Sequence, residues 1–561
     1  MCAMLVLASA AIAQPHDPIT PAADARFGEA TATPRPGFAV GVIQNGELIH
    51  ESYWGYANLE HQIKIDAASK FYIASMSKQF TAALIGQLIE DEKLSLNDSV
   101  RTYLPDLPEI YEPVTIAHCM WHTSGVREYT SLLLIRGDDL RGQDRMTHAD
   151  ALALISQQVD LDFAPGTEMR YSSSGYVLLS AVIEAIEDTP FREVAEQRLF
   201  DPLGMDNTLF DDDHGEIVLD RVQSYRRQDA GAHGEWRSWL KHFDVVGDGG
   251  VLTTLTDLEK WDRELSNGKV LGKTLQRFLK TQGVLNDGTE LPYGGGLWLT
   301  DDRAVESHGG GMGGFISDQI RFPELGVSVY VLANRNDDFA FQGWAFAADV
   351  LTKLGLDNPL SSAEPSLAEG SFETDNADDL KGAYFLQKRN NRRFVRGHPE
   401  GGLALHDGGD AFLARLHPQS DGSFLTVPGL SRVAFSSEEP ALTMTFETDT
   451  YAYTGWRYDD KPPSSIEQVR DMAGRYCSNE LKSAFELIID DELLLFQQQN
   501  APPIQLFPTP EGSNVSWNGN DRVWTGAFML KKVTSSDTEV MGFDVGDGRV
   551  SGVSFHSCAP Q

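Results

Sequence analysis

Two short apolar runs near the start of the chain are separated by a turn. The first run covers residues 38–43 and the second covers residues 48–54, with Asn45-Gly46 between them. Asn-Gly supplies the two positive φ angles that a tight hairpin turn requires. The pattern therefore predicts an antiparallel β-hairpin.

A second hairpin is predicted much later in the chain. Residues 315–322 and 327–333 are apolar runs on either side of a Pro-Glu-Leu-Gly turn, and an apolar helical stretch follows from about residue 339 to residue 354. Between the two hairpins, apolar residues recur at helical spacing, most clearly over residues 78–94. If the first and last segments form one sheet around these helices, the fold is an α+β domain that ends near residue 356.

The last third of the chain contains an internal repeat. Residues 379–384 are similar to residues 471–476, and residues 415–423 are similar to residues 505–513, so the offset is about 90 residues. Both copies consist of short alternating runs that Gly, Asp and Pro interrupt. This pattern is typical of antiparallel β-barrels. Each copy is therefore predicted to be an antiparallel β-domain of barrel type.

The N-terminal 13 residues form a long apolar run, about half the length that a bilayer-spanning helix needs. The run ends in Ala-Ile-Ala, the small-x-small pattern of a signal-peptidase site, although it has no basic n-region. We interpret it as an export signal of a bacterial periplasmic or secreted protein, with a frayed apolar tail as the alternative. The predicted order is signal, α+β domain, linker, first barrel and second barrel, at residues 1–13, 14–358, 359–378, 379–460 and 466–561.

Composition and charge narrow the function. Hydrophobic residues make up 41% of the chain and charged residues 23%, which excludes a mainly disordered or fibrous protein. The excess of 82 Asp+Glu over 46 Lys+Arg gives a net charge of −36. Such a surface repels nucleic acid and anionic lipid. It would attract a cationic substrate, although solubility or salt tolerance is a commoner reason for such a charge.

The candidate nucleophile is Ser75, which begins a long amphipathic helix with Lys78 one turn later on the same face. An amine there can accept the hydroxyl proton, and the helix N-terminus favours the alkoxide that develops. Ser238 and Ser266 also have a lysine three residues later. Spacing does not choose among the three, but only Ser75 starts such a helix.

Two more polar segments complete the pattern. Residues 171–173, Tyr-Ser-Ser, precede an apolar helical run at residues 177–186, and the phenol could act as a base. Residues 308–311, His-Gly-Gly-Gly, precede the predicted strand at residue 315, and glycines there let a substrate backbone lie against a strand edge.

These three segments, in this order, resemble the serine β-lactamase and penicillin-binding-protein superfamily, in its class C-like branch of esterases, D-aminopeptidases and DD-carboxypeptidases. Ser75 and Lys78 stand in place of the family's Ser-x-x-Lys, residues 171–173 in place of Tyr-x-Asn, and residues 308–310 in place of Lys/His-x-Gly. The resemblance covers about residues 38–356. It implies a β-lactamase/DD-peptidase-like hydrolase domain, an antiparallel sheet flanked by helices.

The resemblance implies an acyl-enzyme mechanism without metal or cofactor. Ser75 attacks the carbonyl, Tyr171 takes its proton with help from Lys78, and the backbone N–H groups of Ser75 and Gly311 meet the oxyanion. His308 helps to place the substrate and polarises the network around Tyr171. Ser173 and Gly310 are implied as substrate-binding residues.

Two departures from the family pattern bear on the substrate. Ser173 replaces the usual Asn and loses the paired donor and acceptor of an amide. His308 replaces Lys, which in this branch looks more like a D-aminopeptidase than a β-lactamase, and D-aminopeptidases of this superfamily also carry two C-terminal barrels. The implied activity is release of an N-terminal D-amino acid from an amide or short peptide with a free amine.

Two alternatives remain open. An esterase or DD-carboxypeptidase would use the same site, and a catalytically silent cell-wall peptide sensor would use the barrels to bind its ligand. A zinc site at His118 and His122 is disfavoured, because no Glu follows His118 and no third ligand is evident.

Two expectations concern the last barrel. The polar tip at residues 518–522 lies between two tryptophans, and by resemblance a loop of this barrel enters the cleft, where Asp521 would receive the substrate ammonium. Cys477 and Cys558 fall in the first and last strands of the second repeat, which adjoin if a barrel closes, so they are predicted to form a disulfide. Two unrelated thiols are the alternative. Cys119 is predicted to stay free.

Overall fold

The computed structural model describes most of the first two thirds of the chain, and the strands of the last third. In the first part the described residues are 18–28, 34–138, 145–231, 234–239, 242–300, 303–336 and 342–359. In the last third they are the strands given below together with Lys381, residues 473–490, Val550 and residues 552–558. Within these ranges, no helix is long and apolar enough to cross a membrane. The export signal and the linker at residues 359–378 lie outside the described residues, except for Pro359.

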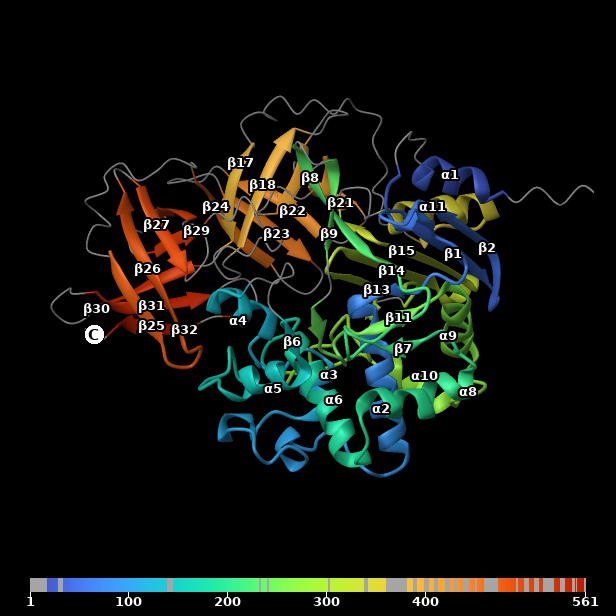
Figure 1. Ribbon diagram of the computed structural model, residues 1–561, viewed down its shortest axis with the longest axis horizontal. Helices are drawn as coiled ribbons and strands as arrows, with labels where there is room; N and C mark the ends of the chain where they lie inside the picture. Colours follow the sequence, from blue (N-terminus) through green and yellow to red (C-terminus); the bar gives the residue numbers. More distant parts are fainter. Residues whose placement is uncertain are drawn as a thin grey trace, which may run out of the picture.

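A six-stranded antiparallel sheet organises the first part of the chain (Figure 1). Both predicted hairpins are confirmed, and β15 lies beside β1, so the two ends of the domain meet in one sheet as the pattern predicts. The sheet runs, in order, β12 Trp298–Leu299, β13 Glu306–Met312, β14 Phe315–Phe322, β15 Val327–Ala333, β1 Phe38–Gln44 and β2 Glu47–Trp54.

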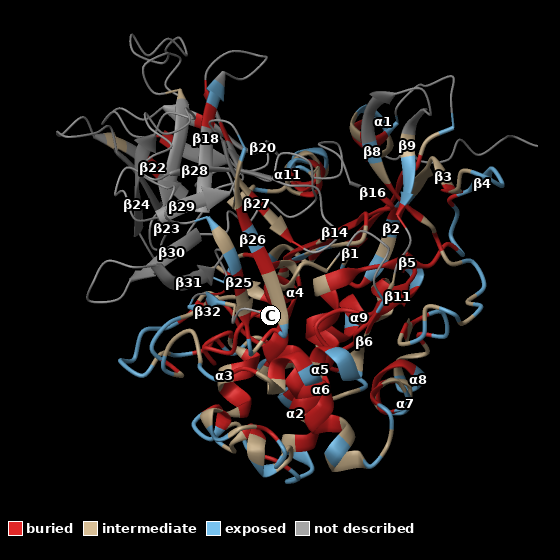
Figure 2. Cartoon of the chain, turned by 60° about the vertical axis from the view of Figure 1, so that its left-hand side comes forward, coloured by how far each residue is buried: buried red, intermediate tan, exposed pale blue. Residues whose placement is uncertain are grey.

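Helices cover both faces of this sheet. On one face α1 and α11 pack together through Phe27 and Phe346, whose ring centroids are 5.2 Å apart. On the other face lies a large core that includes α2, α6 and α9, whose buried segments are red in Figure 2. The helices are α1 Thr20–Phe27, α2 Lys78–Glu90, α3 Ile116–Met120, α4 Tyr129–Arg136, α5 His148–Ser156, α6 Ser173–Glu187, α7 Phe191–Ala195, α8 Asp201–Leu203, α9 Leu255–Asn267, α10 Lys273–Leu279 and α11 Gly343–Leu354.

Three helix boundaries differ from the expectation. Helix α2 ends at Glu90, earlier than residue 94. Helix α6 begins at Ser173, earlier than residue 177, because the polar Ser173 and Ser174 find hydrogen-bond partners within the fold rather than in a loop. Helix α11 begins at Gly343, later than residue 339.

Short strand pairings complete this part of the chain: β3 Tyr56–Asn58 with β4 Ile63–Lys64, β5 Phe71–Tyr72 with β11 Val251–Thr253 and β7 Leu209–Phe210, β6 Met146–Thr147 with β10 Phe243–Asp244, and β8 Ser224–Gly231 with β9 Gly234–Trp239 and β16 Arg335–Asn336.

The two repeat copies fold into two separate sets of eight antiparallel strands. In each set the first strand pairs with the second and with the last, so the strands form a ring. The first set is β17 Gly382–Leu386, β18 Asn391–Gly397, β19 Leu403–Asp407, β20 Phe412–Pro418, β21 Phe424–Val427, β22 Ser431–Ser436, β23 Thr443–Thr448 and β24 Ala452–Tyr458. The second is β25 Gly474–Ser478, β26 Ser483–Asp490, β27 Leu493–Gln498, β28 Ile504–Pro508, β29 Asn514–Trp517, β30 Met529–Thr534, β31 Val540–Gly546 and β32 Val553–Ser557.

Candidate active site

Ser75 lies in a single 3₁₀ turn, η1 Ala74–Ser77, that leads directly into α2. Ala74, immediately before it, has a φ of 46°, a left-handed conformation that costs free energy for a residue with a Cβ. Strain of this kind persists where the surrounding packing fixes the backbone, and Ala74 is buried. Ser75 itself is only partly buried, unlike the residues on either side of it.

Lys78 brings the first two motifs together. Its side chain is fully buried, and its ammonium Nζ donates to Ser75 Oγ at 3.2 Å, to Ser173 Oγ at 3.4 Å and to the backbone oxygen of Asp248 at 2.6 Å. The same Nζ lies 5.0 Å from the ring centroid of Tyr171, within the range of a cation–π contact. A buried ammonium needs such partners to offset its desolvation. The lysine is therefore fixed between the serine and the tyrosine.

Aromatic rings hold Tyr171 in place. The His122 ring lies against it at 4.1 Å between centroids, and the Trp298 indole is nearly parallel to it at 6.5 Å. His122 is buried and has a φ of 61°, and its Nδ1 accepts from the backbone N–H of Ser172, the residue that follows Tyr171. This histidine therefore fixes both the ring and the backbone of the second motif.

Ser173 is anchored through its backbone. Its N–H donates to the carboxylate of Glu128, which also accepts from the Thr130 hydroxyl at 2.8 Å. Glu128 is fully buried. The serine hydroxyl is thereby directed to Lys78, where the family pattern has an amide.

His308 is 3% exposed, and both of its ring nitrogens have partners. Burial, followed by the positive charge of Lys78, lowers the pKa of His308 to about 3, so the ring is neutral near pH 7. Nδ1–H donates to the Gly309 carbonyl at 2.6 Å, which leaves Nε2 to accept from the Tyr293 hydroxyl at 3.0 Å. Its ring centroid is 6.2 Å from that of Tyr171. It lies beside the network as a neutral ring.

The glycines after His308 let β13 lie against the turn that carries Ser75. A Cβ on Gly310 would be 2.2 Å from the Ile73 carbonyl oxygen and 2.5 Å from Ser317 Oγ, which donates to that same carbonyl. Only glycine fits there. In the described part of the chain β12 pairs with β13 only at Glu306 and Ser307, so the edge beyond His308, including Gly311, is open to a ligand backbone.

Asp248 is a site residue that the sequence analysis missed. Burial raises its pKa to about 6, while the neighbouring Lys78 charge lowers it and the Glu128 charge raises it further. The Tyr129 hydroxyl donates to its carboxylate at 3.1 Å. No motif marks Asp248 in the sequence. The glycines on either side of it are the only signal, because they indicate an unusual backbone conformation in this segment.

The other predicted residues divide into three groups. Asp521 and the tip at residues 518–522 lie outside the described residues. Cys477 and Cys558 form a disulfide that joins β25 to the residue after β32, and Cys119 is free and buried. His118 and His122 are used separately, since His118 Nδ1 accepts from the Thr115 N–H in a capping box.

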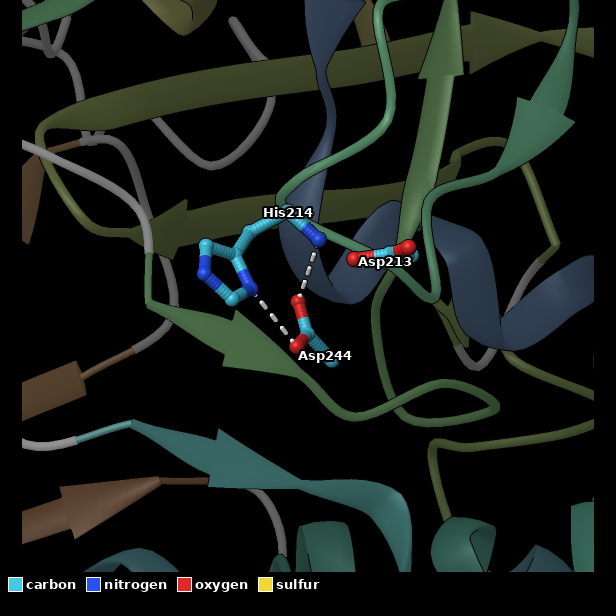
Figure 3. Close-up of side chains that lie close together, drawn as sticks. All are labelled: Asp213, His214 and Asp244. Atoms are coloured by element: carbon cyan, nitrogen blue, oxygen red, sulfur yellow. Dashed lines mark hydrogen bonds and ion pairs between the residues drawn. The ribbon is translucent and has the colours of Figure 1, made fainter.

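A different cluster of titratable groups lies at Asp213, His214 and Asp244 (Figure 3). The Asp244 carboxylate accepts hydrogen bonds from the backbone N–H of His214 at 2.7 Å and from His214 Nδ1 at 2.8 Å. It also forms an ion pair with Arg145 at 3.1 Å. Burial raises the pKa of Asp244, but these hydrogen bonds outweigh it and lower the pKa overall. With its oxygens engaged by donors in this way, Asp244 anchors the turn at residues 213–215.

The chain is similar in sequence and in overall fold to several known proteins. A family model described as Beta-lactamase matches residues 23–352. A D-aminopeptidase of Gluconobacter oxydans is 28% identical over 305 residues, 54% of this chain and 56% of that protein, so the chain spans just over half of it. A D-aminopeptidase of Brucella anthropi is 26% identical over 470 residues, 81% of each chain. The octameric penicillin-binding protein homologue from Pyrococcus abyssi has a similar fold, with a TM-score of 0.50, 18% identity, and coverage of 86% of this chain and 94% of that one.

Proposed function

This chain belongs to the beta-lactamase family, and from that premise we propose that it is a serine hydrolase that releases N-terminal D-amino acids from amides or short peptides. The observation that carries the proposal is the position of Lys78, whose Nζ contacts Ser75 Oγ and Ser173 Oγ and lies over the Tyr171 ring. A nucleophile, a base and a buried cation in one cluster suit acyl transfer.

The proposed reaction has two steps. Ser75 Oγ forms a bond to the substrate carbonyl carbon while Tyr171, as a phenolate beside the Lys78 ammonium, takes the hydroxyl proton. The C–N bond of the tetrahedral intermediate then breaks as Tyr171 gives that proton to the leaving amine. Water afterwards attacks the acyl-enzyme, and Tyr171 takes the water proton and returns one to Ser75 Oγ. The backbone N–H groups of Ser75 and Gly311 would bind the oxyanion, and each such donor is worth roughly 10²–10³ in rate.

Several features support a substrate with a free amine. Both relatives described above are named D-aminopeptidases. The net charge of −36 attracts a cationic substrate. His308 is neutral near pH 7, so the position that holds a lysine elsewhere in this family adds no positive charge that would repel an ammonium. Asp521 is the proposed acceptor of that ammonium.

A DD-carboxypeptidase or esterase is the second candidate. The open edge of β13 after His308 supports it, because an extended acyl-peptide could add to that edge by backbone hydrogen bonds. The two candidates use the same site and differ in the substrate: the first requires a free amine, whereas the second takes an acylated peptide or an ester.

The organisation along the chain is part of the proposal. We infer a signal at residues 1–13, a hydrolase domain at residues 14–358, a linker at residues 359–378 and two barrel domains at residues 379–460 and 466–561. The disulfide between Cys477 and Cys558 supports export to an oxidising compartment.

One substrate panel tests the proposal. D-Ala-p-nitroanilide and its N-acetyl derivative are offered in parallel with a p-nitrophenyl ester, nitrocefin and acyl-D-Ala-D-Ala. Hydrolysis of the free-amine amide alone is expected, whereas preference for the acylated substrates would support the second candidate. A fluorophosphonate adduct on the tryptic peptide that contains Ser75 would exclude the silent sensor.

A further inference from the structure

Arg127 links the second barrel to the site. Its guanidinium pairs with Glu480, in the turn between β25 and β26, at 2.9 Å, and donates to the Gly552 carbonyl, before β32, at 3.1 Å. The Arg127 side chain is 4% exposed and that of Glu480 is 6% exposed. Within its own domain Arg127 contacts Gln158 at 3.3 Å and Asp162 at 3.5 Å.

The segment that carries Arg127 is bonded to the second catalytic motif at successive residues. Ser172 Oγ donates to the Val126 carbonyl at 3.1 Å, and the Ser173 N–H donates to Glu128. Ser174 Oγ donates to the Arg127 carbonyl at 2.7 Å and accepts from the Tyr129 N–H at 2.8 Å. A shift of Arg127 therefore moves the backbone that positions Tyr171 and Ser173.

The barrel side of this contact is reinforced. Glu480 also accepts from the Ser554 N–H at 3.3 Å, and β25 pairs with β32 at Tyr476 and Cys477. The disulfide between Cys477 and Cys558 joins β25 to the residue after β32, and Glu480 lies just after β25 while Gly552 lies just before β32. The two segments that contact Arg127 are therefore held together by backbone pairing and by a disulfide.

A second contact lies at the end of α4, the helix that begins just after Glu128. Gln498, at the end of β27, donates to the Ile135 carbonyl at 2.6 Å. Carbonyls at a helix C-terminus lack partners within the helix, so a donor from outside satisfies them. The barrel therefore contacts both ends of residues 127–136.

From these contacts we propose that Glu480 is a positioning residue. Through Arg127 it holds the Tyr171–Ser173 segment against Lys78 and so sets the rate at which Ser75 is acylated. This inference rests on the proposed function of Ser75 as the nucleophile. Loss of Glu480 removes the nearer acid partner of the buried Arg127 and leaves Asp162 at 3.5 Å. A displacement of about 1 Å in a catalytic group can cost about 100-fold in rate.

The test uses the full-length protein with Glu480→Ala, the isosteric Glu480→Gln, and Glu486→Ala as a matched control. Glu486 is an exposed acid on β26 of the same barrel. The readouts are the rate of Ser75 labelling by a fluorophosphonate, kcat and KM for D-Ala-p-nitroanilide, and the melting temperature. We expect Glu480→Ala to lower labelling and kcat by about 10- to 100-fold with KM within about twofold.

Glu480→Gln keeps an oxygen for Arg127 and should recover part of the rate, while Glu486→Ala should match the unchanged protein. If Glu480→Ala folds poorly, Glu480→Gln and the paired change Cys477→Ser with Cys558→Ser serve instead, and both should slow labelling at temperatures well below melting. Labelling within twofold of the unchanged protein, even with a lower melting temperature, would overturn the coupling.

The outcomes separate the two proposals. If Ser75 is labelled but no D-amino acid amide is cleaved, the substrate assignment fails and the labelling rates still report the coupling. If the amide is cleaved and Glu480 has no effect, the coupling alone fails. If the wild-type protein is never labelled at Ser75, both the proposed function and the coupling are contradicted.

Discussion

Among single residues, Ser75 is distinguished from the other two serines with a following lysine by its surroundings. Ser238 Oγ accepts from Gln223 on an exposed hairpin, and Ser266 Oγ accepts from the buried Arg321 at 2.7 Å. We expect Ser75→Ala to lower kcat by at least about 10³-fold, because the bond-forming atom is removed. Ser238→Ala should keep full activity. A loss from Ser238→Ala equal to that from Ser75→Ala would overturn the site assignment.

Ser266→Ala provides a contrast of a different kind. It removes an acceptor from a guanidinium that also pairs with Asp262 and Glu306 in the interior. The expected effect is a loss of roughly 1–3 kcal/mol in the free energy of unfolding with kcat unchanged. Denaturant unfolding measured beside the amide assay separates the two quantities.

Asp248 makes the activity depend on pH. Its pKa is raised to about 6, so the carboxylate is charged at pH 8 and takes up a proton as the pH falls through about 6. Protonation removes the negative charge that stabilises the Lys78 ammonium, so kcat should fall on the acid side of this pKa. Asp248→Asn mimics the protonated form and should give a lower plateau at pH 8 without the inflection near pH 6. The measurement is kcat of the wild-type protein and of Asp248→Asn from pH 5 to pH 9. If Asp248→Asn keeps the fall in kcat near pH 6, that fall is due to the titration of another group.

Residues of the candidate site could be proposed from sequence only where a motif marks them. Ser75, Lys78, Tyr171 and His308 lie in short patterns whose chemistry is legible. Asp248 and Arg127 were not identified, because each acquires its role from partners more than 100 residues away, such as Lys78 and Glu480. Local spacing carries no information about such pairs.

Among elements, strand β13 depends on one glycine. A Cβ on Gly310 would approach the Ile73 carbonyl oxygen to 2.2 Å, whereas one on Gly309 would lie 3.3 Å from Asp318 Oδ1 and 3.6 Å from the Ser317 carbonyl oxygen. Gly310→Ala should push β13 away from the turn that carries Ser75, lowering stability by about 1–3 kcal/mol and reducing kcat. Gly309→Ala is the matched control on the same strand and should be much milder. Equal effects of the two changes on kcat and melting temperature would contradict this account.

The disulfide constrains the second barrel at its closing edge. It encloses a loop with a sequence separation of 81 residues. In the chain-entropy model such a loop is worth about 4 kcal/mol as an upper figure. Reduction, or Cys477→Ser, should therefore lower the unfolding midpoint of the full chain. Mass mapping without reductant should recover the two cysteines in one linked peptide pair and Cys119 as a thiol. Alkylation of all three would refute the bond.

The elements themselves were more legible than their ends. Both hairpins were predicted from apolar runs around strong turns, because the residues of a tight turn determine locally where the two strands end. Helix α6 was expected to start at residue 177, but its first turn begins with Ser173 and Ser174, whose partners Glu128 and Arg127 lie in another segment. Tertiary hydrogen bonds extended the helix beyond what the apolar pattern indicates.

At the scale of the whole molecule, the position of the second barrel determines which experiment can test whether the tip at residues 518–522 selects substrates with a free amine. The second barrel both docks on Arg127 and carries the tip at residues 518–522, which is outside the described residues. A truncation after about Asp460 would remove the Glu480 contact and the tip together. A lower rate after truncation would then say nothing about selectivity.

Shortening the tip in the full chain separates the two roles. If Asp521 receives the substrate ammonium, an N-acylated substrate leaves that carboxylate unpaired, at a cost of several kcal/mol. Replacing residues 518–522 by a short Gly-Ser turn, or changing Asp521→Asn, should raise kcat/KM for N-acetyl-D-Ala-p-nitroanilide relative to the free-amine amide by about 10-fold or more. Ser75 labelling should stay unchanged, because the Arg127–Glu480 contact is retained. If the ratio of the two substrates does not move while labelling is normal, the tip is an ordinary solvated turn, and the amine is recognised elsewhere in the site.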